Sequence, residues 1–459
     1  MKLGYLHFEV SERKILLRFF DVFISVLCLA LSSYIFKFSY LDYNSPSITI
    51  WLITFAFYFI LFGEIFQLYS LQVSSNRFLV VKSLFLTTFV TTLFYFFTPY
   101  ISPSLPENRL QIIYFFLLIT FPVMAWRFLY TVVLYTPRYF KNILLVSHST
   151  KINSIIQLID NHGHYNISSY ISDNKIDSLT NFHDIYDNIL ETVLREKITE
   201  IVISPIGFSK EEVIAINKQM VLLFEEGITI KSYESFYEEI TDRLPKEYLN
   251  FDFYNNINLI KVNDNGLYKI FHRLLDIVIS SIGIIILILL IPIIFLINLL
   301  LNRGPLFYIQ ERVGEKGKPF KIYKLRTMVV NAEQNGAVWA IKNDKRITLF
   351  GRFLRNTRLD ESPQFFNILK GDMSIIGPRP ERPEFVKKLE EEIPYYGLRH
   401  VIKPGVTGWA QVKFPYAGSI EEQEKKLRYD LYYIKEQGLF IDFKILIKTI
   451  TTILFFKGQ

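Results

Sequence analysis

Two adjacent carboxylates, Asp360 and Glu361, stand among arginines in the run Arg-Asn-Thr-Arg-Leu-Asp-Glu-Ser-Pro that begins at Arg355. Pro363 closes the run and suits the first turn of a helix, so the pair is predicted to lie at a helix N-terminus, where free N–H groups favour anions. With cations around it, Asp360 should stay ionised and serve as a nucleophile toward phosphorus or as a Mg²⁺ ligand. The run suggests phosphate chemistry, although an Asp-Glu pair taken alone is more typical of helix capping.

The segment from 312 to 359 is rich in Lys and Arg, and the whole chain has a formal net charge of +7. Such an excess fits phosphorylated substrates, anionic lipid headgroups, or the topology signals of a membrane protein. No motif that reads nucleic acid accompanies it, so nucleic acid is not expected as a partner. The 459 residues are 50% hydrophobic and 21% charged, which predicts a membrane part and a soluble part separated along the chain.

Four apolar stretches come first and predict four transmembrane helices, because each is near or above the ~20 residues that cross a bilayer. Lys and Arg precede the first stretch, flank the second connection and follow the fourth stretch, whereas the other connections hold only Lys37 and Arg109. The positive-inside rule therefore places the N-terminus and everything after residue 140 in the cytoplasm. Glu64 and Lys82 are interpreted as interfacial rather than as part of a transport path. The stretches are residues 15–36, 48–68, 78–97 and 110–135.

The middle of the chain, from 142 to about 230, alternates short apolar runs with polar helical stretches. Runs at 143–146, 201–204 and 228–230 predict buried parallel strands, and the stretches between them predict helices, which suggests a small Rossmann-type α/β domain. A dinucleotide site needs a glycine-rich turn after the first strand, yet that turn reads Ser-His-Ser-Thr from Ser147. A structural or regulatory domain without a cofactor is favoured over a dinucleotide-binding one.

A further apolar segment, residues 277–301, carries no charge and is long enough to cross the membrane. Arg273 precedes it, Arg303 follows it, and Pro292 interrupts it where a proline breaks or kinks a helix. If four helices have already returned the chain to the cytoplasm, a fifth span would place the C-terminal third outside, away from nucleotide substrates. A re-entrant helix near 270–303 is therefore predicted, with a kinked fifth span as the alternative.

Six short motifs follow one another in the C-terminal part, and in this order they resemble the motifs of bacterial sugar transferases, the monotopic polyprenyl-phosphate phosphoglycosyl transferases. The whole chain looks like the long, initiating transferases of exopolysaccharide or O-antigen synthesis. The motifs are Gln310-Glu311-Arg312-Val313-Gly314, Tyr323-Lys324-Leu325-Arg326-Thr327-Met328, Leu359-Asp360-Glu361, Gly371-Asp372-Met373-Ser374, Gly377-Pro378-Arg379-Pro380 and Pro404-Gly405-Val406-Thr407-Gly408-Trp409-Ala410-Gln411-Val412.

The expected fold class is a membrane α plus α/β protein with three parts. Residues 1–138 would form a four-helix transmembrane domain. Residues 139–262 would form a degenerate, cytoplasmic Rossmann-like domain without a dinucleotide fingerprint. Residues 263–459 would form the catalytic sugar transferase domain, which includes the re-entrant helix.

The resemblance implies an activity and assigns roles to several residues. Members of the family move a sugar-1-phosphate from a UDP-sugar to undecaprenyl phosphate and release UMP. Asp360 matches the nucleophile that would form an aspartyl-phosphosugar intermediate, and Glu361 matches its partner, with both as ligands of the Mg²⁺ cofactor. Arg355 matches a phosphate-contacting arginine, and Arg379 belongs to the proline-flanked arginine motif near the active site.

Four further positions are carried over with less specific roles. Lys324 and Arg326 occupy motif positions with a phosphate-binding or structural role, and Pro292 matches the proline that breaks the re-entrant helix. Lys403 stands where the family commonly has Arg before Pro-Gly; lysine keeps the charge but loses bidentate phosphate recognition.

The expected partners are a UDP-sugar, undecaprenyl phosphate, membrane lipid and a second copy in a homodimer, at the cytoplasmic face of the bacterial inner membrane. Two other functions compete with this one: a glycosyltransferase that forms a glycosidic bond, and a membrane scaffold for polysaccharide export in which the Asp-Glu pair is only a cap. The sequence does not identify the sugar, because glucose, galactose and N-acetylated sugars all present the same diphosphate.

Overall fold

The computed structural model divides the chain into two compact units, Met1–Tyr233 and Glu234–Gln459. The predicted three-part division at 138 and 262 stays a prediction. The structure describes residues 10–36, 45–70, 77–98, 100–106, 108–133, 141–160, 165–176, 179, 181–249, 266–332, 344–414 and 417–454.

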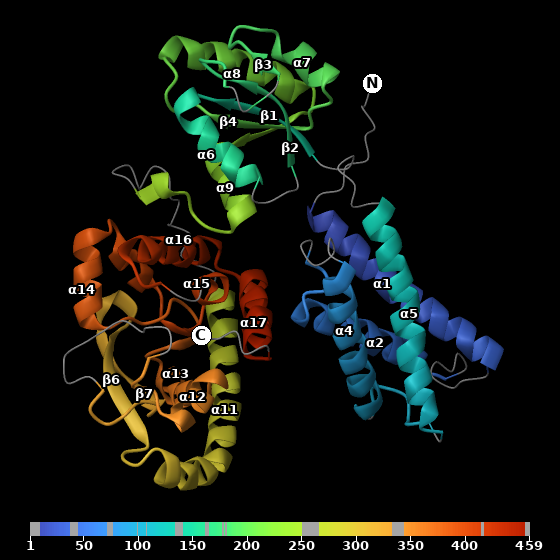
Figure 1. The fold of residues 1–459 in the computed structure, drawn as a ribbon, viewed down its shortest axis with the longest axis vertical. Coiled ribbons are helices and arrows are strands. Elements are labelled where there is room, and N and C mark those ends of the chain that lie inside the picture. The colour runs from blue at the N-terminus through green and yellow to red at the C-terminus, as the bar shows by residue number, and fades with distance from the viewer. Residues whose placement is uncertain are drawn as a thin grey trace. The chain divides into compact units, whose positions relative to one another are not determined.

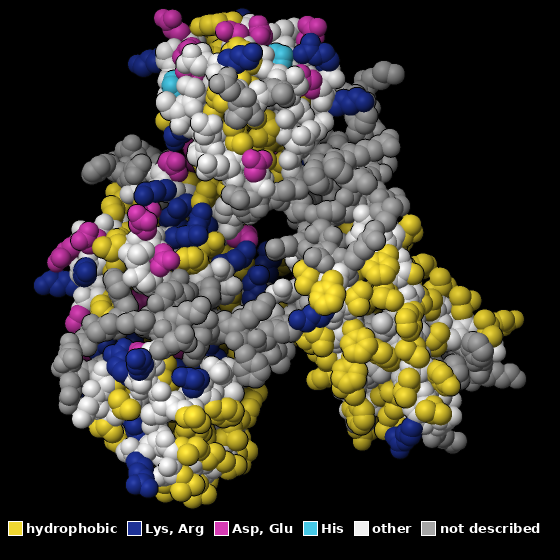
Figure 2. All heavy atoms as spheres, viewed as in Figure 1, with side chains coloured by type: hydrophobic (Ala, Val, Ile, Leu, Met, Phe, Trp, Pro, Cys, Tyr) yellow, Lys and Arg dark blue, Asp and Glu magenta, His cyan; other side chains and the backbone are white. Residues whose placement is uncertain are grey.

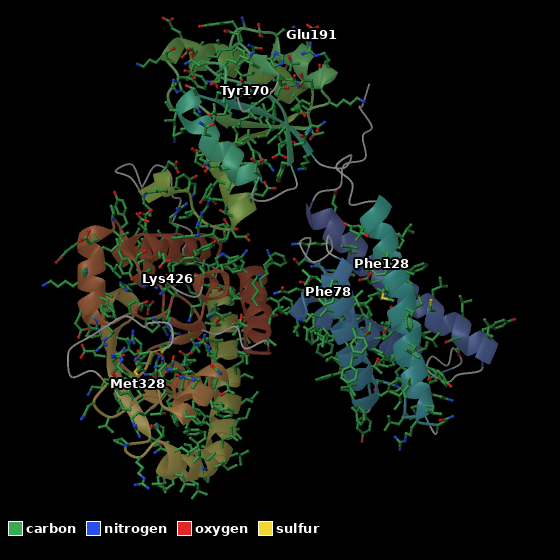
Figure 3. The ribbon with its side chains drawn as sticks, viewed as in Figure 1. Phe78, Phe128, Tyr170, Glu191, Met328 and Lys426 are labelled. Carbon is green, nitrogen blue, oxygen red and sulfur yellow. The ribbon has the colours of Figure 1, made fainter. Side chains whose placement is uncertain are left out.

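The first unit begins with four apolar helices, each long and apolar enough to cross a membrane (Figure 1). Helix α1 packs along α5, and α4 packs against both α2 and α5, around an aromatic core that includes Phe55, Tyr95 and Phe115. Hydrophobic side chains also cover the visible outer surface of these helices (Figure 2), and Figure 3 labels Phe78 and Phe128 among them. A helical membrane-type region is thereby confirmed, while the number of spans stays a prediction. The helices are α1 (Val10–Phe36), α2 (Ile48–Ile65), α4 (Arg77–Phe97) and α5 (Leu110–Val133).

Charged side chains inside this bundle are paired with one another. Asp21 of α1 accepts hydrogen bonds from Arg127 of α5, with 3.0 Å from Nε to Oδ1, and both side chains are at most 1% exposed. Arg18 pairs with Glu64 of α2, so the interfacial glutamate of the sequence prediction has a partner in the neighbouring helix. In the sequence, Arg127 was interpreted only as one of the basic residues that set the topology. Its pairing with Asp21 on the first helix was not predicted.

The α/β part of the first unit has a five-stranded parallel sheet with the order β3-β2-β1-β4-β5. The predicted α/β domain is confirmed, although β2 and β3 were missed, because their polar residues mask the apolar signal of a buried strand. Figure 1 shows α7 and α8 on one side of the sheet and α6 on the other. The elements are β1 (Lys141–Ser147), α6 (Ser149–Asp160), β2 (Tyr165–Ile171), β3 (Phe182–His183), α7 (Ile189–Arg195), β4 (Glu200–Ser204), α8 (Lys210–Glu225), β5 (Thr229–Ser232) and α9 (Tyr233–Thr241), which crosses the boundary between the units.

The turn after β1 is occupied by side chains of the domain itself. The carboxylate of Asp173 accepts hydrogen bonds from the Ser149 backbone N–H (2.7 Å) and the Ser149 hydroxyl (2.9 Å), and lies 3.3 Å from Nε2 of His148. A Rossmann fold offers this helix N-terminus to a pyrophosphate, and here an internal carboxylate takes its place. This arrangement favours the interpretation of a domain without a dinucleotide.

The second unit is built on one long helix, α11, to which a β-hairpin and a series of short helices are attached. Its main core joins Leu389, Trp409, Leu431 and Ile445 from four different helices. The elements are η2 (Lys246–Leu249), α11 (Gly266–Leu301), β6 (Phe307–Val313), η3 (Glu315–Gly317), β7 (Pro319–Leu325), α12 (Leu349–Asn356), η4 (Leu359–Glu361), α13 (Gln364–Lys370), β8 (Ser374–Ile376), α14 (Pro383–Glu392), η5 (Tyr396–Val401), β9 (Gly405–Thr407), α15 (Trp409–Lys413), α16 (Ile420–Glu436) and α17 (Leu439–Leu454).

Helix α11 carries Pro292 inside it, and Figure 1 shows it bending toward its C-terminal end. A proline removes one backbone hydrogen bond and crowds the preceding turn, which accounts for a bend. Hydrophobic side chains gather on the surface of the second unit around this bend (Figure 2). The helix is apolar and long enough to span a membrane, so its re-entrant path stays a prediction.

Candidate active site

Asp360 and Glu361 lie in the short 3₁₀ turn η4, between α12 and α13. Arg358 adopts a left-handed conformation (φ 58°) that turns the chain at the end of α12, and Leu359 packs against an apolar cluster formed by residues of α11, β7 and α12. Both carboxylate residues are buried, with 8% and 7% exposed surface. Pro363 is the N-cap residue of α13 rather than a residue of its first turn, and the pair lies in the turn just before this helix, near the N-terminus that the sequence predicted.

Glu361 is surrounded by positive charge. Its Oε1 accepts a hydrogen bond from Nη2 of Arg379 (2.7 Å) and lies 3.7 Å from Nζ of Lys324 and 3.8 Å from Nη1 of Arg358. Burial opposes its ionisation, but these three cations outweigh burial and hold the pKa of Glu361 well below its usual range. Glu361 is therefore a fixed anion that orders the cations around it.

Asp360 is in a different electrostatic state from its neighbour. Burial, followed by the charge of Glu361, raises the pKa of Asp360 to about 6, against the opposing effect of Lys324, Arg355 and Arg358. Its Oδ1 is buried and has no hydrogen-bond partner among the described residues. Asp360 is thus ionised at neutral pH, as expected from the sequence, and one of its oxygens is left open for an electrophile or a metal ion.

Arg355 comes from the last turn of α12 and is held by the hydroxyl of Thr327, which accepts a hydrogen bond from Nε at 2.9 Å. Burial lowers the pKa of Arg355, and the charge of Asp360 opposes this effect. Arg355, the predicted phosphate-contacting arginine, therefore lies close enough to Asp360 for the two opposite charges to attract each other.

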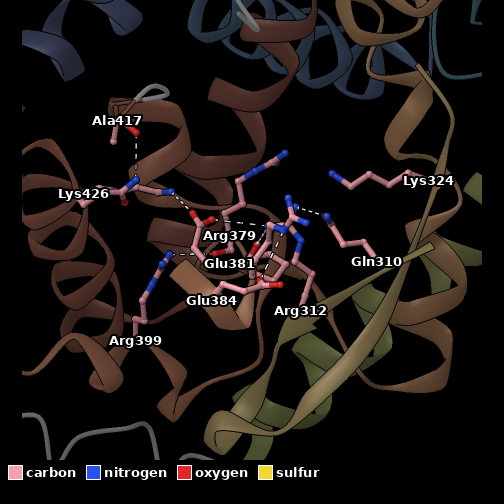
Figure 4. A network of polar contacts seen from close by, with 12 residues as sticks. Gln310, Arg312, Lys324, Arg379, Glu381, Glu384, Arg399, Ala417 and Lys426 are labelled. Atoms are coloured by element: carbon pink, nitrogen blue, oxygen red, sulfur yellow. Dashed lines mark hydrogen bonds and ion pairs between the residues drawn. The ribbon is translucent and has the colours of Figure 1, made fainter. Parts of the chain in front are cut away.

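Lys324 projects from β7 into the same group of charges. Burial, reinforced by the nearby charge of Arg379, lowers the pKa of Lys324 to about 8. Figure 4 shows the side chains of Lys324 and Arg379 pointing toward one another. The positive charges of Lys324 and Arg379 repel each other, and the negative charges of Glu361 and Asp360 offset that repulsion.

The loop that carries Arg379 rests on a buried polar network (Figure 4). Arg399 donates to the carbonyl oxygen of Arg379 (3.0 Å), and Arg312 donates to that of Pro380 (3.1 Å). Glu381 pairs with Lys426 of α16, also labelled in Figure 3, with 2.7 Å from Nζ to Oε1. The backbone on both sides of Arg379 is thereby fixed, which holds its guanidinium against Glu361.

Sequence reasoning missed most of this support. Arg312 stands in a quoted motif, but nothing in the motif assigns it to the loop of Arg379. Arg399 pairs with Asp430 of α16 at 2.7 Å, with both side chains at most 2% exposed, and neither residue has a neighbouring sequence signal. Contacts between residues far apart in sequence become visible only in the fold.

Three predicted site residues have other surroundings. Arg326 donates to the carbonyl oxygens of Pro305 (2.7 Å) and Met328 (2.9 Å) and also bonds Asn302 near the end of α11, which favours the structural role over phosphate binding. The Nζ of Lys403 and a guanidinium nitrogen of Arg273 both lie near Gly371. Pro292 lies inside α11.

The two carboxylates fit a Mg²⁺ ion of the kind found in phosphate-transfer sites. Mg²⁺ usually binds one or two carboxylates and completes its shell with water and substrate phosphates. Asp360 offers a buried oxygen with no hydrogen-bond partner among the described residues, and Glu361 adjoins it. Within the described part of the chain there is no group of three or more His, Cys, Asp or Glu residues that could hold a metal.

Comparison with known proteins places this site in a described family. The family profile "Bacterial sugar transferase" matches residues 267–456. A putative undecaprenyl-phosphate N-acetylgalactosaminyl 1-phosphate transferase of Bacillus subtilis is 52% identical over 132 residues, which cover 29% of this chain and 74% of that protein.

Two longer relatives are similar over a smaller share of their length. A UDP-N-acetylgalactosamine-undecaprenyl-phosphate N-acetylgalactosaminephosphotransferase of Aeromonas hydrophila is 49% identical over 33% of this chain. A UDP-glucose:undecaprenyl-phosphate glucose-1-phosphate transferase of Klebsiella pneumoniae is 42% identical over 42% of this chain. The chain spans 36% and 41% of the length of these two relatives.

Proposed function

Because this chain belongs to the bacterial sugar transferase family, we propose that it transfers a sugar-1-phosphate from a UDP-sugar to undecaprenyl phosphate and releases UMP. The reaction would begin exopolysaccharide or O-antigen repeat-unit synthesis at the cytoplasmic face of the bacterial inner membrane. The observation that carries this proposal is the buried oxygen of Asp360, which has no hydrogen-bond partner in the described part of the chain and lies near the cations Lys324 and Arg355.

In the first proposed step, a carboxylate oxygen of Asp360 attacks the phosphorus that bears the sugar. The bond from this phosphorus to the oxygen bridging to UMP breaks, and UMP leaves with that oxygen and the bond electrons. An aspartyl-phosphosugar intermediate is formed. In the second step, an oxygen of undecaprenyl phosphate attacks the same phosphorus, the bond to Asp360 breaks, and the carboxylate is restored.

The basic side chains supply electrostatic stabilisation in both steps. Three phosphate groups carry negative charge through the reaction, and fixed cations in a buried site offset charge that develops at phosphorus. Arg355 is held by Thr327, and Arg379 by Glu361 and its supported loop, so neither has to reorganise. Mg²⁺ bound by Asp360 and Glu361 would neutralise charge on the UMP leaving group.

The proposal is tested by measuring UMP release from UDP-sugars with the purified full chain in lipid or detergent. Repeated turnover should require both undecaprenyl phosphate and Mg²⁺, whereas without undecaprenyl phosphate the first step should release at most about one UMP per chain. A panel of UDP-glucose, UDP-galactose and their N-acetylated forms then identifies the sugar, which differs among the relatives. Release of UDP in place of UMP would indicate a glycosyltransferase, and no release with any sugar would favour the scaffold alternative.

The expected homodimer belongs to this proposal as well. The mass of the solubilised chain in its lipid belt, measured by light scattering, distinguishes one copy from two. A single copy under conditions that preserve UMP release would rule out a required dimer.

A further inference from the structure

One face of α11 is polar, although the helix as a whole is strongly apolar. Tyr268, His272, Asp276 and Ser280 follow one another at intervals of four residues, which places them on a single face. Tyr268, Asp276 and Ser280 are buried, and this face packs against the rest of the second unit. The polar face therefore does not meet lipid; it attaches the membrane helix to the catalytic unit.

Asp276 joins this helix to the strand that leads to Arg379. Its Oδ1 accepts two hydrogen bonds, from the Ser374 hydroxyl (2.9 Å) and from the Ile375 backbone N–H (2.8 Å). Asp276 is 3% exposed, so a lost acceptor would leave the N–H buried and unsatisfied. Ser374 and Ile375 belong to β8, which runs directly into the loop that carries Arg379.

Arg273, one turn earlier on α11, holds the other element of the site. Its guanidinium donates to the carbonyl oxygens of Ile368 (2.7 Å) and Leu369 (2.9 Å) at the end of α13. Because α13 starts directly after η4, this contact fixes the helix that follows Asp360 and Glu361. Arg273 and Asp276, three positions apart on α11, thus hold α13 and β8. These two elements adjoin Glu361 and Arg379, which are joined by a hydrogen bond.

From this arrangement we infer that Arg273 and Asp276 are positioning residues, which set Arg379 against Glu361 by fixing β8 and α13 to the membrane helix. The effect expected on kcat rests on the proposed function. The effect expected on hydrogen exchange does not. Neither residue touches the reacting atoms; each acts through backbone that it holds.

The first test follows hydrogen exchange of the segment 374–380 in the full chain embedded in lipid. Asp276→Ala should raise the exchange of this segment at least tenfold, whereas Asp276→Asn should keep it near the wild-type rate, because the amide oxygen still accepts both bonds. Ser280→Ala is the matched control, since Ser280 is buried on the same face and its hydroxyl has no partner within the described residues. Unchanged exchange in Asp276→Ala would overturn the inference even if the wild-type chain shows no transferase activity.

The second test is kinetic and separates positioning from a general loss of fold. Asp276→Ala should lower kcat about tenfold or more and change the KM for the UDP-sugar less than threefold, and Asp276→Asn should restore kcat. If Asp276→Ala fails to insert in the membrane, Ser374→Ala removes one of the two bonds to Asp276, together with the bond that the hydroxyl accepts from the Ile376 N–H (3.3 Å), and should give a smaller loss of the same kind. The inference fails if the Asn variant is as impaired as the Ala variant, or if Ser374→Ala has wild-type exchange and kcat. A wild-type chain that releases no UMP contradicts the proposed function alone.

Discussion

Asp360 supplies the attacking oxygen in the proposed mechanism, and Asp360→Asn removes its charge while keeping its shape. Turnover should fall by about four to six orders of magnitude, the range of loss for removing a member of a covalent catalytic unit. UMP release measures this, with the wild-type chain in the same lipid as the reference. Near-normal UMP release by a folded, membrane-bound Asn variant would contradict the covalent mechanism.

The unequal ionisation of the two carboxylates predicts a pH dependence. The pKa of Asp360 is raised to about 6, so the attacking anion is lost as the pH falls through 6, and kcat/KM should drop about tenfold per pH unit below it. Glu361 stays charged in this range because its pKa is lowered. In Glu361→Gln the negative neighbour is gone, the pKa of Asp360 should fall, and the acidic limb of the profile should move to lower pH.

A profile of kcat/KM between pH 5 and 8 checks this prediction, with stability measured at the same pH values. An acidic limb at the same pH in wild type and Glu361→Gln would show that another group controls the rate.

Single residues show how far sequence reasoning reaches in this site. The order of motifs led to Asp360, Glu361 and Arg379, which the structure brings together. Arg326 also stands in one of these motifs, yet it donates hydrogen bonds to backbone carbonyl oxygens near the end of α11. A motif does not say which way a side chain points. Arg399 had no local signal for its supporting role, since the two partners that tie it to the site, Arg379 and Asp430, lie about 20 and 31 residues away.

Helix α11 was predicted in outline as an apolar segment broken at Pro292, and the structure extends it to 36 residues from Gly266. Its polar stripe was not predicted, because Tyr268, His272 and Asp276 lie before the uncharged segment 277–301 from which the helix was predicted. The short strand β8 was missed for a related reason: three residues are too few for a periodic pattern, and its pairing with β9 depends on glycines that let the backbones approach.

The path of α11 gives a prediction at the level of this element. If the helix is re-entrant, cysteines introduced at Gly266 and at Lys316 should both react with an impermeant thiol reagent from the cytoplasmic side. Cys28 is replaced by serine beforehand, and a cysteine at Leu289, an exposed apolar position on α11, serves as a lipid-facing control that should not react. Labelling of the two outer positions from opposite sides would establish a fifth span.

At the scale of the whole molecule, the compact unit that holds the site begins well before α11. Leu244 is fully buried in the main core of this unit. Asp242 also pairs with Lys413, and its carbonyl oxygen accepts a hydrogen bond from the indole of Trp409 (2.9 Å). The segment 234–249 therefore belongs physically to the catalytic unit, although the sequence offered no sign of this.

This packing predicts how truncated chains behave. A chain that starts at Glu234 should fold and keep Mg²⁺-dependent UMP release, because it retains both the site and the segment that covers its core. A chain that starts at Val262, outside the described residues, loses Leu244 and should be less stable by about 2–5 kcal/mol, the range for deleting a large core side chain. Thermal unfolding in detergent compares the two. An inactive but folded chain from Glu234 would mean that the first unit supplies part of the site.

The buried pair of Asp21 and Arg127 has a consequence for how the chain enters the membrane during synthesis. Asp21 emerges from the ribosome on the first apolar helix, and its partner follows about a hundred residues later on α5. A lone carboxylate or guanidinium is costly in hydrocarbon, so neither helix can settle into lipid by itself at low cost. Docking of α1 against α5 removes this cost for both helices at once, so the pair favours assembly of the bundle over separated helices. Loss of either partner alone would leave the other as a buried, uncompensated charge.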